Sequence, residues 1–471
     1  MMNNYKVRWI VLLCFSLMFA QSSVVRGDKI ASDLEEVSPV LKVGRAWPGH
    51  PVGFALLTKG DFQLVSWYDP ERRMVVASRR LGERDWKKIT LPEQVPWDSH
   101  NSIVVAIDEA GCIHLSGNMH VDPLNYYRTT RPMDITSFKQ IDHMVGQDED
   151  RCTYPRFMKG PDGRLVFMYR DGKSGAGRNI LNIYDSDTQQ WNRLIQTPLL
   201  DGGELANAYP KGPILGPDGK YHIVWMWRDT GDAATNHHIS YMCSDDLAHW
   251  RSASGKHITL PVNMETADVV IDPVPPREGL INMVYGIGFD REHRPIIMYH
   301  KYDSDGRSQI FNARWETDAW RIYQTSDWDE RWDFGGGGSI KAMVRAQPVQ
   351  VLPDGRLVQA WRHWKYGGGA WVLDPDTLTP TGPIDPGGKV PKHLGRVRSA
   401  FPGMGVRWAS DIAGPRPDGN VFRLRWETLG RNRDKPRTGP LPEPSKLELY
   451  EFMPLTFSEK SDATKRPAPQ R

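Results

Sequence analysis

One turn-centred pattern recurs seven times along the chain. Each copy has an apolar strand, a turn with Gly or Asp, and an aromatic-rich strand, as in "FMKGPDGRLVFMYRD" and "ILGPDGKYHIVWMWRD". In the Pro-Asp-Gly turns, Pro fixes the first turn dihedral, Asp caps the turn and Gly takes a positive φ. Each copy is therefore a predicted β-hairpin. The turns are centred near Gly60, Gly111, Gly163, Gly219, His293, Gly355 and Gly419.

The spacing of these turns predicts the fold class. Successive turns lie roughly fifty to seventy-five residues apart, which is the length of a four-stranded blade with its loops. After most turns, an aromatic residue opens a later strand at a similar distance. These residues are Trp86, Phe138, Trp191, Trp250 and Trp320. The sequence thus predicts an all-β fold, a seven-bladed β-propeller of four-stranded antiparallel blades.

The ends of the chain define the expected domain limits. We predict that the propeller occupies residues 34–457 and that Val37–Val43 supplies the strand that the seventh copy lacks. Residues 1–27 place two basic side chains before a short apolar run, which is typical of a signal peptide, with a membrane anchor as the alternative. Residues 458–471 are polar and predict a disordered tail. We expect a secreted or periplasmic protein without a membrane span in the mature chain.

Composition excludes some classes of partner and cofactor. The net charge of +3 is too small to favour nucleic acid. Beyond the N-terminal segment the cysteines are Cys112, Cys152 and Cys243, an odd number without close spacing. They predict buried free thiols, and neither a disulfide framework nor a four-cysteine zinc site. The many Arg side chains suit a polyanionic ligand where they converge, and we expect a monomer.

Two pairs of polar residues flank neighbouring hairpin turns. In a hairpin, residues equidistant from the turn face each other. His100 and His120 are equidistant from the "DEAG" turn, and Tyr154 and Arg170 are equidistant from the next "PDG" turn. All four lie at a similar distance from their turns, so we expect them on one rim of the propeller in adjacent blades.

This set of side chains predicts β-elimination on a uronic acid. An Arg fork neutralises the carboxylate and acidifies the neighbouring proton, while His or Tyr groups remove that proton and protonate the departing oxygen. The chemistry requires no cofactor. Hydrolysis by two carboxylates would need a flanking acidic pair, which the rim motifs do not offer. We expect Asp98 and Asp171 to orient His100 and Arg170.

Four segments resemble a known family. The motifs "WDSHNSI", "HLSGNMHVDPL", "CTYPRF" and "FMYRDG" resemble the BNR-type seven-bladed propellers that include ulvan lyases, over nearly all of the mature chain. The resemblance implies a catalytic set of His100, His120, Tyr154 and Arg170, and cleavage between a sulfated rhamnose and a uronic acid. It also implies that Tyr154, with His100, transfers protons, that Arg170 holds the carboxylate and that His120 supports the site.

Other polar residues are candidate contacts to an anionic polysaccharide or oligosaccharide. Lys173 and Arg178 lie in the basic loop "DGKSGAGRN", where they could meet a sulfate or a second uronate. The alternative is a solvated hairpin connection. Arg228 and Asn118 are further predicted substrate-binding residues.

Two other functions remain open at this level. A related branch of the same family implies an α-L-rhamnosidase that releases terminal rhamnose from rhamnose-α-1,4-glucuronate with one histidine in the first blade. His50 in "AWPGHPVGF" would take that role, although it is equally consistent with a structural rim residue. A non-catalytic glycan-binding propeller would keep the aromatic and basic residues and would need no acid and base.

A cluster in the fourth repeat suggests a structural metal, either zinc or calcium. The candidate ligands are His222, His238 and Cys243, with His237 beside them. Strand alternation points some of these side chains to opposite faces of the sheet. The cluster is therefore a weaker hypothesis than the rim site.

Overall fold

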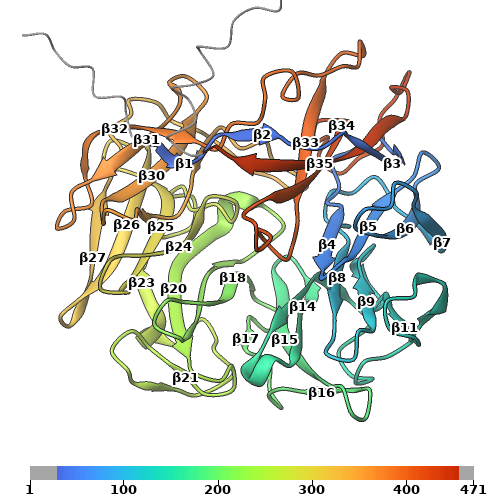
Figure 1. Ribbon diagram of the computed structural model, residues 1–471. Coiled ribbons are helices and arrows are strands. Elements are labelled where there is room, and N and C mark those ends of the chain that lie inside the picture. The colour runs from blue at the N-terminus through green and yellow to red at the C-terminus, as the bar shows by residue number, and fades with distance from the viewer. Residues whose placement is uncertain (1–28, 456–471) are drawn as a thin grey trace, which may run out of the picture.

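The computed structural model describes residues 29–455 and is a seven-bladed β-propeller (Figure 1). Seven separate sheets are arranged around a central axis, which confirms the predicted fold class. The predicted signal peptide and the predicted disordered tail lie outside the described residues. No helix within residues 29–455 is long and apolar enough to cross a membrane.

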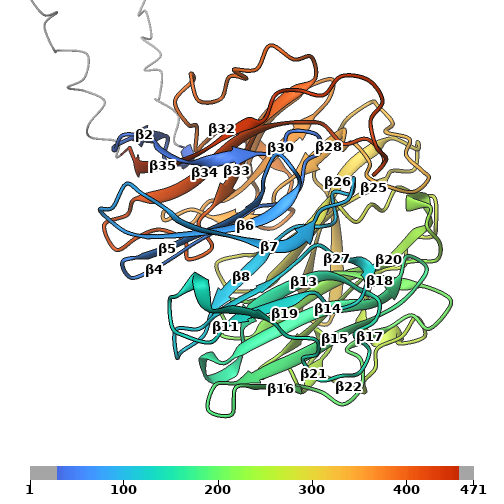
Figure 2. The same ribbon diagram turned by 90° about the vertical axis from the view of Figure 1, so that its right-hand side faces the viewer.

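The first three blades follow one another along the chain (Figures 1 and 2). Blade 1 consists of β4 (Ala55–Lys59), β5 (Phe62–Tyr68), β6 (Arg73–Arg80) and β7 (Lys87–Gln94). Blade 2 consists of β8 (Val104–Ile107), β9 (Ile113–Ser116), β11 (Tyr126–Thr129) and β12 (Phe138–Gln140). Blade 3 consists of β13 (Cys152–Lys159), β14 (Leu165–Lys173), β15 (Ala176–Asp185) and β16 (Gln190–Arg193), with β10 (His120–Asp122) and β17 (Leu200–Asp201) paired to it.

Blades 4 and 5 continue the ring. Blade 4 consists of β18 (Asn207–Leu215), β19 (Tyr221–Arg228), β20 (Asn236–Ser244) and β21 (Trp250–Arg251), extended by β22 (His257–Ile258) and β23 (Val270–Asp272). Blade 5 consists of β24 (Tyr285–Phe289), β25 (Pro295–Tyr302), β26 (Ser308–Glu316) and β27 (Ala319–Gln324). The helical segments of the described chain are short 3-10 turns: η1 (Ile135–Ser137), η2 (Pro161–Gly163), η3 (Ala233–Thr235) and η4 (Ala267–Val269).

Blades 6 and 7 combine strands from both ends of the described chain. Blade 6 consists of β28 (Val344–Ala346), β29 (Gln350–Val351), β30 (Leu357–His363), β31 (Gly367–Leu373) and β32 (Pro380–Gly387), with β1 (Lys29–Ala31) parallel to β32. Blade 7 consists of β33 (Met404–Ser410), β34 (Val421–Leu429) and β35 (Ser445–Pro454), completed by β2 (Leu34–Glu36) and β3 (Leu41–Ala46). Because β2 and β3 both pair with β35, the N-terminal segment closes the ring as predicted, although the paired strands lie on either side of residues 37–40 and do not span the predicted Val37–Val43.

The predicted turn chemistry is also present. All seven predicted turn residues have a positive φ, including His293 at 62°, the one without a glycine. A positive φ is inexpensive for Gly and uncommon for His. The turns therefore lie at the positions that the sequence repeat predicts. They are on the side of the propeller opposite to the polar pairs.

The hydrophobic core lies between neighbouring blades. One cluster joins blades 7, 1 and 2, and another packs Val166 and Leu181 of blade 3 against the fully buried Trp225 of blade 4. Each sheet thus buries its faces against its neighbours, as expected for radial stacking. This packing leaves the central channel free for polar and charged side chains.

The cysteines are free thiols, as predicted. Cys112 and Cys152 are buried, whereas Cys243 is partly exposed. Burial raises the pKa of the Cys152 thiol, and the nearby Glu149 raises it further. These thiols are therefore protonated packing groups at neutral pH.

Candidate active site

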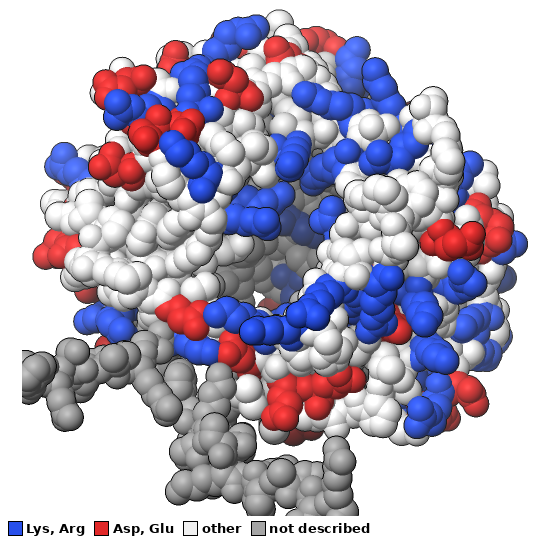
Figure 3. All heavy atoms as spheres, turned by 90° about the horizontal axis from the view of Figure 1, so that it is seen from above, with Lys and Arg blue, Asp and Glu red and all other residues white. Residues whose placement is uncertain are grey.

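A cavity of about 570 Å³ opens near the axis on the side of the propeller opposite to the hairpin turns. Figure 3 shows a face that is hollowed near its middle, with Lys and Arg side chains gathered around the hollow. The polar residues that line the cavity come from blades 2 to 5 and from two later loops. They include His100, His120, Tyr154, Tyr209, Lys211, Arg228, Asn282 and Arg431.

His100 and His120 meet in this cavity. Their rings stack with centroids 4.1 Å apart, and each side chain is about a quarter exposed. The hairpin pairing holds only as far as Val104 opposite Ser116. His120 then leaves blade 2 and lies on β10, where it pairs with Thr153 of blade 3. The two imidazoles are brought together as predicted. The cause is the pairing of β10 with blade 3, and not pairing within the hairpin of blade 2.

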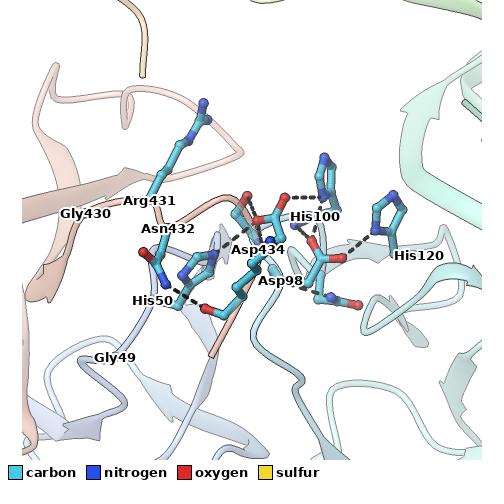
Figure 4. Close-up of polar contacts among 12 residues, drawn as sticks. Gly49, His50, Asp98, His100, His120, Gly430, Arg431, Asn432 and Asp434 are labelled. Atoms are coloured by element: carbon cyan, nitrogen blue, oxygen red, sulfur yellow. Dashed lines mark hydrogen bonds and ion pairs between the residues drawn. The ribbon is translucent and has the colours of Figure 1, made fainter. Parts of the chain in front are cut away.

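Asp98 binds the Nδ1 atom of both imidazoles. The Nδ1 of His100 lies 2.5 Å from one Asp98 oxygen, and the Nδ1 of His120 contacts the other oxygen (Figure 4). Burial alone would raise the pKa of Asp98, but the hydrogen bonds from His100 and His120 lower it well below its usual range. An ionised carboxylate only accepts, so each imidazole donates from Nδ1. Each Nε2 is left available to a ligand.

Tyr154 lies at a β-bulge in the innermost strand of blade 3. Its φ is 57°, and the register shifts between Thr153 and Arg156. As a result Thr153, rather than Tyr154, is paired with Arg170, which corrects the predicted pairing. The bulge turns the Tyr154 ring into the cavity, 5.7 Å from the His100 ring and 38% exposed.

Arg170 lies beneath Tyr154 and does not line the cavity. It is 1% exposed, and its guanidinium carbon lies 5.0 Å from the centre of the Tyr154 ring. Nη2 donates to Thr153 Oγ1 at 3.0 Å, whereas Nε and Nη1 have no hydrogen-bond partner within the described chain. In this conformation Tyr154 covers Arg170, so the predicted contact between Arg170 and a carboxylate is not available.

The surroundings of Tyr154 keep its hydroxyl protonated. Loss of water raises the pKa of Tyr154 first, and the neighbouring Tyr209 raises it further. The positive charges of Arg170 and Arg228 act in the opposite direction and do not cancel these effects. At neutral pH Tyr154 is therefore a proton donor.

Arg228, a predicted substrate-binding residue, lines the cavity wall, and three hydrogen bonds hold its largely buried guanidinium. Nε donates to Asn236 at 3.1 Å, Nη1 donates to the Tyr209 hydroxyl at 3.1 Å and Nη2 donates to Asn282 at 2.9 Å. A guanidinium has five N–H groups. These three bonds leave one further N–H on each Nη that is not used in them.

The other predicted substrate contacts lie away from this cavity. Arg178 pairs with Asp171 at 3.0 Å and with Asp148 at 3.2 Å, so Asp171 orients Arg178 and not Arg170 as predicted. Asn118 donates to Glu93 at 2.8 Å, and Lys173 is exposed on the hairpin loop. Ser174 and Asn179 of the same loop do line the cavity, whereas ion pairing with Asp148 and Asp171 holds the Arg178 side chain elsewhere.

His50 is a buried residue of the supporting network. It is 1% exposed, and its Nε2 lies 3.2 Å from Asp434 (Figure 4). Asp434 also accepts from the backbone N–H and the hydroxyl of Ser99, and it lies 3.6 Å from His100 Nδ1. Sequence reasoning missed Asp434, because nothing in the loop after β34 signals that it reaches blades 1 and 2.

The three predicted metal ligands of blade 4 do not all lie together. His222 uses both ring nitrogens, on Tyr241 at 2.7 Å and on Asp218 at 2.8 Å. His238 lies on the far part of β20, where its Nδ1 is 2.5 Å from that of His237. His222 and Cys243 are cross-strand partners, but this arrangement does not bring His238 to them, so a metal site of all three stays a prediction. Within residues 29–455 the group with metal-like spacing is Asp98, His100 and His120, whose ligand atoms lie within 4.8 Å of one another.

The fold and the repeat define the class of this protein. The family described as "BNR repeat-containing family member" matches residues 62–328, which is more than half of the chain. The chain belongs to this family.

Individual relatives are similar to the chain over shorter segments. The short isoform of ulvan lyase from Alteromonas sp. (strain LOR) is 27% identical over 134 residues, covering 25% of this chain and 25% of the relative. A long isoform of ulvan lyase from Alteromonas sp. is 21% identical over 282 residues, covering 47% of this chain and 28% of the relative. The chain thus spans about a quarter of the length of these curated relatives.

Solved structures share the fold at low identity. The polysaccharide lyase Uly1 has a TM-score of 0.58 and 15% identity, with 90% of this chain and all of that chain covered. A PL25 ulvan lyase bound to -[GlcA(1-4)Rha3S]- has a TM-score of 0.57 and 14% identity, with 92% of this chain and all of that chain covered. These likenesses concern the arrangement of the seven blades.

Proposed function

We propose that the protein is a polysaccharide lyase that cleaves rhamnose–uronic acid linkages of an acidic, ulvan-like glycan by β-elimination. The observation that carries this proposal is the pair of imidazoles fixed by Asp98, opposite the protonated Tyr154, in a cavity lined by Arg228. The sequence similarity to ulvan lyases supports the same class. A polysaccharide substrate also fits the export that residues 1–27 predict.

The first step is binding of the uronate carboxylate. Arg228 has one free N–H on each Nη and offers a bidentate fork at the cavity wall. When the C5 proton leaves, negative charge is delocalised from C5 into the attached carboxylate, and the positive charge of Arg228 stabilises it there. Arg170 has a different role, since it is covered by Tyr154 and acts on the site through that ring.

We assign the proton transfers to His100 and Tyr154 from the hydrogen bonds of their surroundings. His100 Nε2 accepts the C5 proton, and the electron pair of the C5–H bond forms the C4=C5 double bond as the C4–O bond breaks. Tyr154 donates its proton to the departing oxygen. Asp98 stabilises the imidazolium that forms on His100, and transfer of a proton from His100 to Tyr154 restores the site.

The alternative functions fit the geometry less well. A rhamnosidase that uses His50 would need this side chain to reach the substrate, but His50 is buried against Asp434. A glycan-binding propeller would need no acid and base, and it would not require one carboxylate to hold two imidazoles by Nδ1. We therefore favour the lyase.

The test is incubation of the purified protein with ulvan and with rhamnose–glucuronate oligosaccharides. Elimination produces a conjugated unsaturated uronate, so we expect ultraviolet absorbance to rise together with new reducing ends. New reducing ends without absorbance would indicate hydrolysis and overturn the proposal. Binding without any product would favour the non-catalytic module, and the His100→Ala variant serves as the inactive control.

A further inference from the structure

Two imidazoles and two carboxylates lie close together at one wall of the active-site cavity. One ring nitrogen of His100, one of His120 and an oxygen of Asp98 lie within 4.8 Å of one another, and the nitrogens that face Asp98 are the Nδ1 atoms. A second carboxylate, that of Asp434, places Oδ2 3.6 Å from His100 Nδ1. Figure 4 shows both carboxylates directed at His100, with His120 beyond Asp98. Three segments that are distant in sequence thus supply two nitrogen and two oxygen ligand atoms.

Asp434 has one oxygen that is engaged and one that has no hydrogen-bond partner. Oδ1 accepts from the backbone N–H of Ser99 at 3.1 Å and from its hydroxyl at 3.0 Å, and it lies 3.2 Å from His50 Nε2. The side chain is 10% exposed, and within the described residues its buried Oδ2 has no hydrogen-bond partner. A buried carboxylate oxygen without a partner is costly. A cation bound between this oxygen and the imidazoles would remove that cost.

Further contacts hold both carboxylates in place. The backbone N–H of His100 donates to Asp98 at 2.8 Å. The loop that carries Asp434 is fixed by the preceding Arg433, whose Nη1 donates to two carbonyl groups in residues 335–337, each at 3.0 Å. In protein metal centres, the carboxylates that bind the ion are themselves oriented by outer hydrogen bonds of this kind. The two carboxylates therefore have the support that a metal ligand needs.

The donor atoms select the kind of ion. Imidazole nitrogens combined with carboxylate oxygens suit Zn²⁺, whereas Ca²⁺ and Mg²⁺ prefer sites made of oxygen alone. Two carboxylates also balance the double charge of the ion. The side chain of His100 is 22% exposed, that of His120 27% and that of Asp98 18%, so an ion can reach them from the cavity. The four side chains thus match zinc in ligand type, charge and access.

We propose that Asp98, His100, His120 and Asp434 form a zinc site that holds the active site in an inactive form. Zinc binds an imidazole nitrogen only when that atom carries no proton. With zinc on Nδ1, the one ring proton of a neutral imidazole lies on Nε2 instead. His100 Nε2 can then no longer accept the C5 proton. This inhibition rests on the proposed function, whereas the binding of zinc does not depend on it.

Zinc binding is measured first, without any assay of activity. Isothermal titration of the EDTA-treated and dialysed protein with zinc chloride should give saturable binding, whereas magnesium chloride should not. His120→Gln and Asp434→Asn should each bind zinc at least about tenfold more weakly than the wild type. The matched control is His249→Gln, which removes the histidine of an exposed pair whose Nδ1 lies 2.7 Å from Asp246. This control should bind zinc like the wild type.

Two further measurements keep the inference decisive. His120 is partly exposed, so His120→Gln should keep the circular dichroism spectrum of the wild type. Zinc should raise the Tm of the wild type and not that of this variant, because an ion that binds only the folded state stabilises it. Wild-type zinc affinity in both His120→Gln and Asp434→Asn would overturn the inference. Loss of zinc binding in Cys243→Ser, with binding retained in His120→Gln, would place the ion in blade 4 and would also overturn it.

The outcome is separable from the proposed function. If the protein is a lyase, zinc should abolish elimination over the concentrations at which it binds, and EDTA should restore the activity. Full lyase activity at saturating zinc would overturn the inhibition and leave the lyase standing. Zinc binding without any lyase activity would overturn only the proposed reaction. Activity that requires zinc would overturn both the inhibition and the assignment of His100 as the base.

Discussion

At the scale of single residues, Tyr154 and Arg170 take different positions, although the sequence predicted that both face the substrate on one rim. The positive φ of Tyr154 places its ring in the cavity and over Arg170. Arg170 is left with two buried N–H-bearing nitrogens that have no hydrogen-bond partner. Such a group is costly to bury, and its position is consistent with a role in the electrostatics of the Tyr154 hydroxyl.

The first prediction concerns that hydroxyl. Tyr154→Phe removes only the proton donor, so elimination should fall by roughly 10²–10⁴-fold while the fold is retained. The measurement is kcat on a confirmed substrate, with circular dichroism to verify folding. Near-wild-type turnover in the variant would remove Tyr154 from the proposed mechanism.

The second prediction compares two arginines. Lysine keeps the charge but loses the bidentate fork. If Arg228 holds the carboxylate, Arg228→Lys should reduce kcat/KM by about 10–100-fold, a loss typical of one positioned charged hydrogen bond. Arg170→Lys should have the smaller effect because Arg170 does not line the cavity. The reverse order would mean that Tyr154 moves aside and that Arg170 is the clamp.

At the scale of elements, the bulge in β13 marks the limit of what hairpin arithmetic predicts. Arg156 and Met168 are equidistant from the turn and face each other as predicted. Closer to the site the register shifts by one residue, so that Thr153 faces Arg170. A bulge at a non-glycine residue has no clear sequence signal, because its cost is repaid by tertiary contacts. The turns were predictable because Gly and Pro-Asp-Gly carry their own backbone preferences.

The third prediction tests the residue that holds this bulge. Thr153 is fully buried, and its Oγ1 accepts from the backbone N–H of Val121 at 2.8 Å and from Arg170 at 3.0 Å. Thr153→Val leaves both donors without this acceptor, so the free energy of unfolding should fall by about 1–3 kcal/mol. Urea denaturation measures the change. Thr90→Val on the exposed outer strand β7 is the control, and equal stability of both variants would contradict the prediction.

At the scale of the whole molecule, the site depends on contacts that no local pattern contains. Sequence spacing predicted that His100, His120, Tyr154 and Arg170 lie near one another, because neighbouring hairpins share a rim. It did not predict Asp434, Lys211 or Arg431, since their positions follow from closure of the ring and from loop paths. The position of Arg178 has the same origin, because its ion pairs with Asp148 and Asp171 decide where this side chain points.

The fourth prediction concerns Asp434, which links loops of blades 7, 1 and 2. Burial raises its pKa, but the bonds from His50 and from the Ser99 backbone lower it to about 2. A pKa that is depressed in the folded state gives stability that is present above the unfolded pKa, near 4, and is lost as the pH falls toward 2. The contribution is on the order of 2 kcal/mol.

The measurement is the unfolding free energy of wild type and Asp434→Asn between pH 7 and pH 2. The wild type should be more stable at pH 7, and the gap should narrow as the pH falls below 4 because the native carboxylate becomes protonated. A gap that stays constant over this range would show that the ionised form of Asp434 does not contribute to stability.

The closure of blade 7 also sets the order in which the molecule can be completed. Leu41 pairs with Leu449, so β3 has no partner until β35 has been synthesised, after all the intervening blades. Until then β3 has an unpaired edge, and the ring stays open through the synthesis of all the intervening blades. A chain interrupted before Ser445 lacks β35 and therefore cannot close the ring.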